Sequence, residues 1–122
     1  MFSVLIVEDH ALLRSLLEGD VIRMRPDASV ISCGSLDEAL RLLASRPCDL
    51  ILLDLDLPDA KGLDAVRHLR AASSASSLVV VSASDSPRLK AQARELGAAR
   101  FLEKGEDLDE FYAGLREVLG AR

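Results

Sequence analysis

The sequence predicts an α/β fold in which five strands alternate with five helices, giving a (βα)5 doubly wound five-stranded parallel sheet with helices on both faces. Short apolar runs, several rich in Val and Ile, recur along the chain, and longer stretches with helical periodicity separate them. The runs are apolar at consecutive rather than alternating positions, which is typical of strands covered on both faces. Strands that alternate with helices join through right-handed crossovers, so the sheet should be parallel.

The expected strands are short apolar segments that end at polar or small residues. They are 3–7, 28–33, 49–54, 77–82 and 99–102. In a doubly wound sheet, ligands bind outside the carboxyl ends of the strands, near the point where the strand order reverses. The residues directly after each strand are therefore the first candidates for a functional site.

The stretches between the strands are expected to be helical. The first and third helices each carry an apolar face, formed by Leu12, Leu13, Leu16 and Leu17 and by Leu63, Val66 and Leu69. Ser35 and Glu38 form a capping-box pattern at the start of the second helix. The segment 85–87, Asp-Ser-Pro, predicts the start of the fourth helix, and Gly97 predicts its end. The fifth helix is expected over 106–119.

Length, charge and hydropathy limit the class of protein. The chain has 122 residues, and we expect 1–122 to be one domain with no second domain. Its net charge of −5 argues against nucleic acid as a direct partner, because phosphate contacts need a basic surface. No apolar run is long enough to span a membrane, and the N-terminus has no basic leader. The expected compartment is the cytoplasm.

The two cysteines, Cys33 and Cys48, have no nearby Cys or His partner in the sequence. They therefore match neither a zinc site nor a redox motif. We expect both to be buried as small apolar residues.

Polar residues follow four of the expected strands. They are Glu8, Asp9, Asp54, Asp56, Ser82 and Lys104. Because the carboxyl ends of parallel strands meet at one edge of the sheet, these residues should gather there. Several carboxylates at one place repel each other unless a cation lies between them.

This donor set favours a hard cation. Oxygen ligands in small number favour Mg²⁺, with Mn²⁺ as an alternative, whereas zinc would normally require His or Cys. An ammonium and a hydroxyl beside such an ion can receive phosphoryl oxygens. A carboxylate in the middle can attack phosphorus and form an acyl phosphate. The sequence therefore predicts Mg²⁺-dependent phosphoryl transfer to an aspartate.

Four motifs, each at the end of an expected strand, carry a resemblance to a known family. They are "VEDH" at 7–10, "LLDLDLPDAKG" at 52–62, "VVVSA" at 79–83 and "FLEKG" at 101–105. Together they resemble the receiver domain of bacterial two-component response regulators over essentially the whole chain. The resemblance implies a flavodoxin-like fold and a phosphorelay role in signal transduction.

The resemblance implies roles for the acidic residues. Asp54 resembles the phosphoacceptor, since Pro58 and Gly62 follow it at the family's spacing. Asp9 matches a Mg²⁺ ligand, as does Asp54 itself. Glu8 matches the neighbouring acid that often acts on the metal through water, and the backbone carbonyl of Asp56 would be a further ligand.

The same resemblance assigns the remaining site residues. Lys104 resembles the phosphate-binding lysine, and Ser82 takes the place of the hydroxyl residue that moves onto the phosphoryl group. Phe101, three residues before Lys104, matches an aromatic switch. Asp54, Ser82 and Lys104 would thus form the catalytic set, and Ser82 and Phe101 the switch.

The family mechanism implies a sequence of events. A histidine kinase or phosphotransfer protein donates its phosphoryl group to Asp54, and the face formed by the fourth helix, fifth strand and fifth helix is then remodelled. The domain controls a target protein or a DNA-binding output domain outside this chain, and water later hydrolyses the acyl phosphate. It is therefore a signalling phosphoacceptor that catalyses only its own phosphorylation and dephosphorylation. Homodimerisation on phosphorylation is a hypothesis.

This sequence departs from the family pattern at three places. One is Phe101, an aromatic residue that has no hydroxyl to form a hydrogen bond in either position. Gly105 stands where the family often has Pro after the lysine, and we assume no cis peptide bond there. Asp56 places a carboxylate two residues after the phosphoacceptor. In the family, that position and the one that Ser84 takes here tune the lifetime of the phosphoryl group, and a carboxylate could either orient or repel the attacking water.

Two other functions are less consistent with this sequence. A phosphatase of the haloacid-dehalogenase-like superfamily would use Asp54 as nucleophile and Asp56 as general acid. It is disfavoured because that motif belongs on the first strand, not the third, and because the chain is short for that fold. A pseudo-receiver that binds partners without phosphorylation is disfavoured because the acids, the serine and the lysine are all present.

Overall fold

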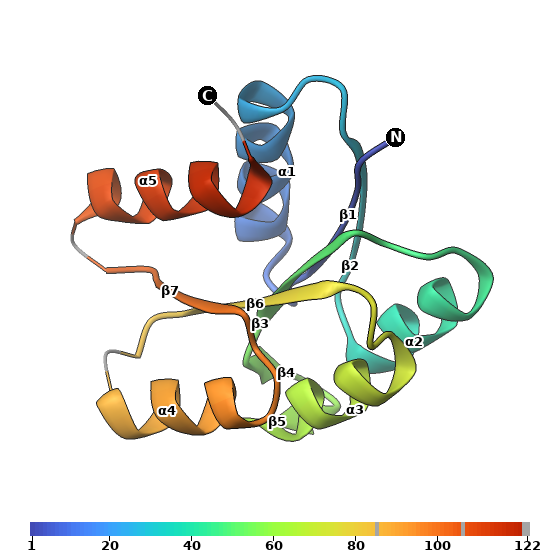
Figure 1. Ribbon diagram of the computed structural model, residues 1–122, viewed down its shortest axis with the longest axis vertical. Helices are drawn as coiled ribbons and strands as arrows, with labels where there is room; N and C mark the ends of the chain where they lie inside the picture. Colours follow the sequence, from blue (N-terminus) through green and yellow to red (C-terminus); the bar gives the residue numbers. More distant parts are fainter. Residues whose placement is uncertain (85, 106, 121–122) are drawn as a thin grey trace.

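The computed structural model describes residues 1–84, 86–105 and 107–120. Its main sheet has five parallel strands in the order β2-β1-β3-β6-β7 (Figure 1). The strands are β1 (Ser3–Val7), β2 (Ser29–Cys33), β3 (Leu50–Asp54), β6 (Ser77–Ser82) and β7 (Arg100–Glu103). The fold class predicted from the sequence is confirmed.

Five helices cover the two faces of this sheet. They are α1 (Ala11–Met24), α2 (Leu36–Ser45), α3 (Asp64–Ala72), α4 (Pro87–Glu95) and α5 (Leu108–Leu119). In Figure 1, α1 and α5 lie on one side of the sheet and α2, α3 and α4 on the other. Ser86 caps α4 by accepting a hydrogen bond from the Leu89 N–H at 3.2 Å. The predicted starts at Asp85 and Glu106 lie outside the described residues, and Asp107 is the N-cap of α5.

The apolar strand runs supply two cores, one on each face of the sheet. Along β3, Ile51 and Leu53 pack toward α2, α3 and α4, whereas Leu50 and Leu52 pack toward α1 and α5. Successive side chains of a strand point to opposite faces, so a strand buried on both sides must be apolar at every position. This explains the consecutive apolar residues. None of the helices in the described ranges is long and apolar enough to cross a membrane.

A hairpin that the sequence did not predict follows β3. It consists of β4 (Asp56–Leu57) and β5 (Ala60–Lys61), which pair antiparallel. Leu57 is buried in the core shared with α2 and α3, which anchors one side of the hairpin. The hairpin thus starts two residues after Asp54, the last residue of the central strand β3, with only Leu55 between them.

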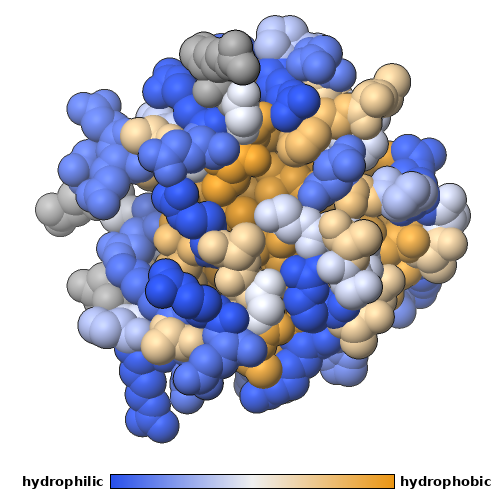
Figure 2. All heavy atoms as spheres, in the orientation of Figure 1, coloured by the Kyte–Doolittle hydropathy of each residue, from blue (hydrophilic) through white to orange (hydrophobic). Residues whose placement is uncertain are grey.

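The first helix differs from its expected packing. Leu17 is buried, but Leu12, Leu13 and Leu16 are 72%, 38% and 55% exposed. The expected apolar face of α1 is therefore mostly at the surface. Figure 2 shows hydrophobic side chains at the surface in the region where α1 meets α5.

The two cysteines are reduced thiols within the fold. Cys33 is buried and burial raises its pKa to about 11, whereas Cys48 is only half-buried, with its pKa also raised by burial. The expectation of burial is thus confirmed for Cys33 and only partly met for Cys48. A thiol with a raised pKa is a poor nucleophile and metal ligand.

Candidate functional site

The carboxyl ends of four strands bring the polar residues together. Asp54 ends β3 and is paired in register with Val81 of β6, one residue before Ser82. Lys104 follows β7 and its N–H donates to the carbonyl of Ser82 at 2.8 Å, which extends the pairing of β6 and β7. Glu8 follows β1 and its N–H donates to the carbonyl of Cys33 at 3.0 Å. Regular strand pairing therefore fixes the backbone of every one of these positions.

Lys104 joins two buried carboxylates. Its Nζ donates a hydrogen bond to Oε1 of Glu8 at 2.8 Å and lies 3.6 Å from Oδ1 of Asp54. Glu8 is fully buried and Asp54 is 5% exposed. Two buried acids with one ammonium leave an excess of negative charge, and a buried unpaired charge is costly.

The pKa values of the two acids shift in opposite directions. Burial raises the pKa of Asp54 to about 6, and the adjacent Glu8 adds to this rise while Lys104 opposes it. Burial also acts to raise the pKa of Glu8, but the hydrogen bonds with Lys104 and Asp54 outweigh it and the pKa falls below its usual value. Of the two acids, Glu8 is thus the one that stays ionised and pairs with Lys104. When Asp54 is ionised, a further cation beside it would stabilise its negative charge.

The neighbours of Glu8 hold it in this position. The His10 N–H donates to Oε2 of Glu8 at 3.2 Å, and the Arg14 guanidinium donates to the Glu8 carbonyl at 3.0 Å. Asp9, between these residues, is exposed just before α1. The sequence placed Glu8 as a neighbour acting through water, and the structure adds an ion pair to Lys104 that was not expected. Arg14 was not anticipated either, because its contact depends on how α1 begins.

The predicted cation ligands are few, and not all of them are side chains. Within residues 1–84, 86–105 and 107–120, no three His, Cys, Asp or Glu side chains are grouped so that they could hold a metal by themselves. The predicted set of Glu8, Asp9, Asp54 and Asp56 needs fewer directly bound side chains, since Glu8 would act through water and Asp56 through its backbone carbonyl. Mg²⁺ sites in proteins commonly have this composition, with one or two carboxylates and several waters. The donor chemistry at this edge therefore fits Mg²⁺.

The two predicted switch residues lie on adjacent strands. Ser82 is buried, and its Oγ accepts a hydrogen bond from the Ser84 N–H at 3.2 Å. Phe101 is half-buried, with Lys90 Nζ of α4 at 5.9 Å from its ring centroid. Lys90 also forms an ion pair with Glu103, and these three side chains line a cavity of about 350 Å³. The cavity leaves space beside the ring.

The peptide bond between Lys104 and Gly105 is trans. This agrees with the assumption made from the sequence.

The strand order, with sites at the carboxyl edge, defines a flavodoxin-like α/β protein of the receiver type. Comparison with protein families matches residues 4–116 to the response regulator receiver domain. The chain therefore belongs to the response regulator receiver domain family.

Individual relatives support this family assignment. The chain is 39% identical over 123 residues to the KDP operon transcriptional regulatory protein KdpE of Escherichia coli K12, covering 98% of this chain and 52% of the relative. The chain spans about half the length of the first curated relatives it matches. Its fold is similar to that of the chemotaxis response regulator CheY4 of Vibrio cholerae, with a TM-score of 0.82, 22% identity, and coverage of 97% and 98% of the two chains.

A further solved structure is a response regulator protein from Burkholderia pseudomallei, described as holding a phosphorylated aspartic acid, a calcium ion and citrate. The likeness has a TM-score of 0.75 and 23% identity, and it covers 98% of this chain and 69% of that one. At this identity the likeness shows the fold alone.

Proposed function

We propose that residues 1–122 form one phosphoacceptor receiver domain that takes a phosphoryl group onto Asp54. The observation that carries this proposal is the placement of Lys104, whose ammonium lies 3.6 Å from Oδ1 of Asp54 while Glu8 holds it from the other side. A phosphoryl group bound to Asp54 would carry its new charge next to that ammonium. The phosphorylated aspartate described for the Burkholderia pseudomallei relative supports the same assignment.

The transfer step follows from the buried carboxylate. A carboxylate oxygen of Asp54 attacks the phosphorus of a phosphohistidine, a P–O bond forms, and the P–N bond breaks with the imidazole leaving and taking up a proton. Lys104 and the hydroxyl of Ser82 stabilise the charge on the phosphoryl oxygens. Mg²⁺, or Mn²⁺ in its place, would be held by Asp9, Asp54 and the Asp56 carbonyl, with Glu8 through water, and would neutralise the crowded negative charge. Later attack by water on phosphorus returns free Asp54 and inorganic phosphate.

The site also suggests how phosphorylation is transmitted. Movement of the Ser82 hydroxyl toward the phosphoryl group would break its contact with the Ser84 N–H and leave space for Phe101 to turn inward. The ring lies under Lys90, which pairs with Glu103, so its movement would change the face made by α4, β7 and α5. This face would carry the signal to a target protein or to a DNA-binding output domain outside this chain. KdpE, about twice as long as this chain, is described as a transcriptional regulator.

The phosphoryl donor is a histidine kinase or a phosphotransfer protein, and its docking surface lies beside the site. A second cavity, of about 310 Å³, runs between α1 and α5 and includes Lys104 in its lining together with Leu13, Leu16, Leu108 and Tyr112. Exposed apolar side chains next to a reactive group mark a protein-binding surface. Such a donor draws on ATP, so the cytoplasm is the proposed compartment. The domain itself acts on no separate substrate.

The experiment that tests this function is intact mass spectrometry of the chain after incubation with acetyl phosphate, with and without Mg²⁺. Wild type is expected to gain the mass of one phosphoryl group only when Mg²⁺ is present, and Asp54→Asn is expected to gain none. If wild type gains none, and beryllofluoride also fails to bind, the chain is a binding module without phosphorylation. A gain by Asp54→Asn would mean that another residue is the acceptor.

A further inference from the structure

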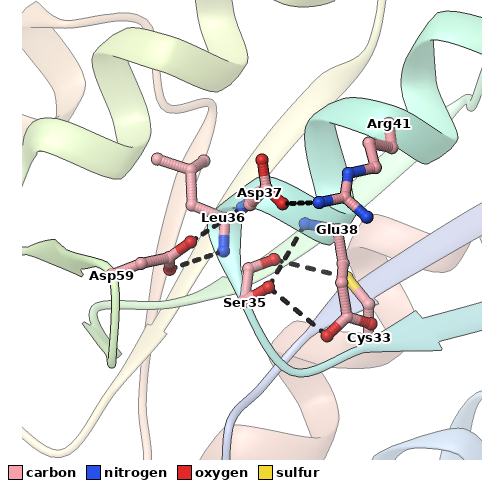
Figure 3. A network of polar contacts seen from close by, with 7 residues as sticks. All are labelled: Cys33, Ser35, Leu36, Asp37, Glu38, Arg41 and Asp59. Carbon is pink, nitrogen blue, oxygen red and sulfur yellow. Dashed lines mark hydrogen bonds and ion pairs between the residues drawn. The ribbon is translucent and has the colours of Figure 1, made fainter.

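Asp59 links the hairpin after β3 to the start of α2. It lies in the turn between Leu57 and Ala60, and its two carboxylate oxygens accept hydrogen bonds from the N–H groups of Leu36 and Asp37, both at 2.9 Å (Figure 3). These are the first two residues of α2, whose N–H groups have no partner within the helix. Asp59 is therefore a helix cap supplied from a distant segment.

The same helix has a second cap, supplied locally. Ser35 Oγ accepts a hydrogen bond from the Glu38 N–H at 3.2 Å. Figure 3 shows Ser35 and Asp59 meeting the first turn of α2 from different segments of the chain. The capping-box serine thus serves one N–H, whereas Asp59 serves two and at the same time fixes the hairpin.

The hairpin carries part of the proposed cation site. Asp56 begins β4 and is paired with Lys61, and its backbone carbonyl lies two residues after Asp54 and three before Asp59. The hairpin has only two paired residue positions, so its own ladder is too short to hold it. Buried Leu57 anchors it in the core, and Asp59 anchors its turn on α2. Both anchors follow Asp56 within three residues, so they restrain the segment that carries its carbonyl.

We propose that Asp59 is a positioning residue for the phosphoacceptor site. By holding the hairpin on α2, it keeps the Asp56 carbonyl where it completes a divalent-cation site with Asp9 and Asp54. This inference rests on the proposed function, because it assigns Asp59 a part in forming that same site. Groups that orient metal ligands from outside the coordination sphere commonly affect metal affinity by tenfold or more.

The competing explanation is that Asp59 only stabilises α2. Ser35→Ala is the matched control, because it removes a cap from the same turn of the same helix and leaves the hairpin untouched. If Asp59 is merely a cap, Asp59→Ala and Ser35→Ala will lower thermal stability similarly and both will bind Mg²⁺ as wild type does. A positioning role predicts that only Asp59→Ala loses Mg²⁺ affinity.

The test is isothermal titration of the full chain with MgCl₂ for wild type, Asp59→Ala, Asp59→Asn and Ser35→Ala. We expect Asp59→Ala to bind Mg²⁺ about tenfold more weakly. Ser35→Ala should stay within about twofold of wild type, since it leaves every proposed ligand and its support unchanged. Asp59→Asn should be intermediate, because one carboxamide oxygen can still accept from one N–H while its NH₂ group cannot.

A second readout is the Mg²⁺ concentration for half-maximal phosphorylation by acetyl phosphate. It should rise in Asp59→Ala by the same factor as the dissociation constant, with the rate at saturating Mg²⁺ little changed. Equal Mg²⁺ affinity in Asp59→Ala and Ser35→Ala would overturn the inference and leave the proposed function intact. Failure of wild type itself to bind Mg²⁺ would overturn both. If Asp59→Ala does not fold, the comparison of Asp59→Asn with Ser35→Ala decides in the same way.

Discussion

The Nζ of Lys104 donates a hydrogen bond of 2.8 Å to Oε1 of Glu8, which joins two residues 96 positions apart. Lys104 follows β7 and Glu8 follows β1, and in the sheet order the strands β3 and β6 lie between these two. The lysine side chain therefore reaches across the end of β3, where Asp54 lies. The Glu8 carboxylate is fully buried, so this contact determines both where the ammonium lies and whether Glu8 can be ionised.

Replacing Lys104 by Met should destabilise the fold. The change leaves the buried carboxylate of Glu8 without its cation, and breaking one side of a buried ion pair costs about 3 kcal/mol or more. The measurement is the free energy of unfolding in urea at pH 7. In the double variant with Glu8→Gln part of this loss should be recovered, because the fully buried charge of Glu8 is then gone and only Asp54 is left without the ammonium. Strictly additive losses would show that the two side chains are not coupled.

Asp54 should make stability depend on pH in the absence of divalent cations. Its pKa is about 6 in the folded chain, above the value of an unfolded aspartate, because burial disfavours the charged form. The folded chain therefore retains a proton that the unfolded chain has lost, and the free energy of unfolding falls as pH rises from about 4 to 6. Relative to Asp54→Asn, wild type should lose on the order of 2–3 kcal/mol between pH 4 and 7.

The comparison with Asp54→Asn is needed because Glu8 contributes the opposite trend. Its lowered pKa gives stability that is present above the normal glutamate range and is lost as pH falls through the folded value. The contact with Lys104 gives this contribution in both proteins, whereas the contact with Asp54 gives it only in wild type, so the difference between the two proteins reports Asp54 together with its coupling to Glu8. Urea titrations in EDTA from pH 4 to 7.5 measure it, and parallel curves for the two proteins would show that Asp54 is not perturbed.

The strand-end residues could be predicted from the sequence because parallel strands share one edge. Glu8, Asp54, Ser82 and Lys104 need only correct strand ends to come together, and each expected strand ends within about two residues of the observed one. The Glu8–Lys104 pair could not be predicted, since it depends on side-chain direction at two positions with neighbours on other strands. The β4–β5 hairpin is too short to show any periodicity.

The exposed face of α1 shows a different limit of prediction from the sequence. Leucine spacing predicts which residues share a helix face, but not whether that face points to the core or to a partner. Here the spacing of Leu12 and Leu16 is that of a core face, yet both are more than half exposed. Under the proposed function this face would be part of the surface that contacts the phosphoryl donor.

Gly97 should not tolerate a side chain. Its φ of +109° favours glycine, and an added Cβ would come within 2.5 Å of Cδ of Arg70. Arg70 also donates to the Gly97 carbonyl at 3.1 Å, so this glycine packs against an arginine that ties α3 to the loop before β7. Gly97→Ala should lower the free energy of unfolding by about 2 kcal/mol.

Gly19→Ala is the matched control for that change. Gly19 lies within α1, and its added Cβ would meet nothing closer than Arg23 Nη1 at 4.0 Å. Alanine is about 1 kcal/mol more favourable than glycine inside a helix, so this variant should be more stable than wild type. Chemical denaturation of both variants gives the sign of each change in the free energy of unfolding. A neutral Gly97→Ala would contradict the close packing against Arg70.

Lys90 should restrain the Phe101 ring. The lysine pairs with Glu103 and lies 5.9 Å from the centroid of the ring, so both contacts favour the half-buried position seen here. Lys90→Met removes a partly exposed ion pair and should cost at most about 1 kcal/mol of stability. If the ring must leave this position on activation, the same change should speed phosphorylation by acetyl phosphate about two- to fivefold.

Glu103→Gln is the companion variant for the Lys90 prediction, because it breaks the ion pair while leaving the ammonium near the ring. It should speed phosphorylation less than Lys90→Met does. Line widths of the Phe101 ring in NMR spectra report its mobility directly. Unchanged rates and unchanged line widths in both variants would rule out a restraint by Lys90.

The measurement that most directly tests the central claim is chemical trapping of the acyl phosphate. The chain is incubated with acetyl phosphate and Mg²⁺, reduced with borohydride, which converts a phosphorylated aspartate to homoserine, and digested for peptide mass mapping. We predict homoserine at position 54 alone, dependent on Mg²⁺, with Asp9 and Asp56 unmodified. Homoserine at another position, or none in a chain that remains folded, would contradict the assignment of Asp54 as the phosphoacceptor.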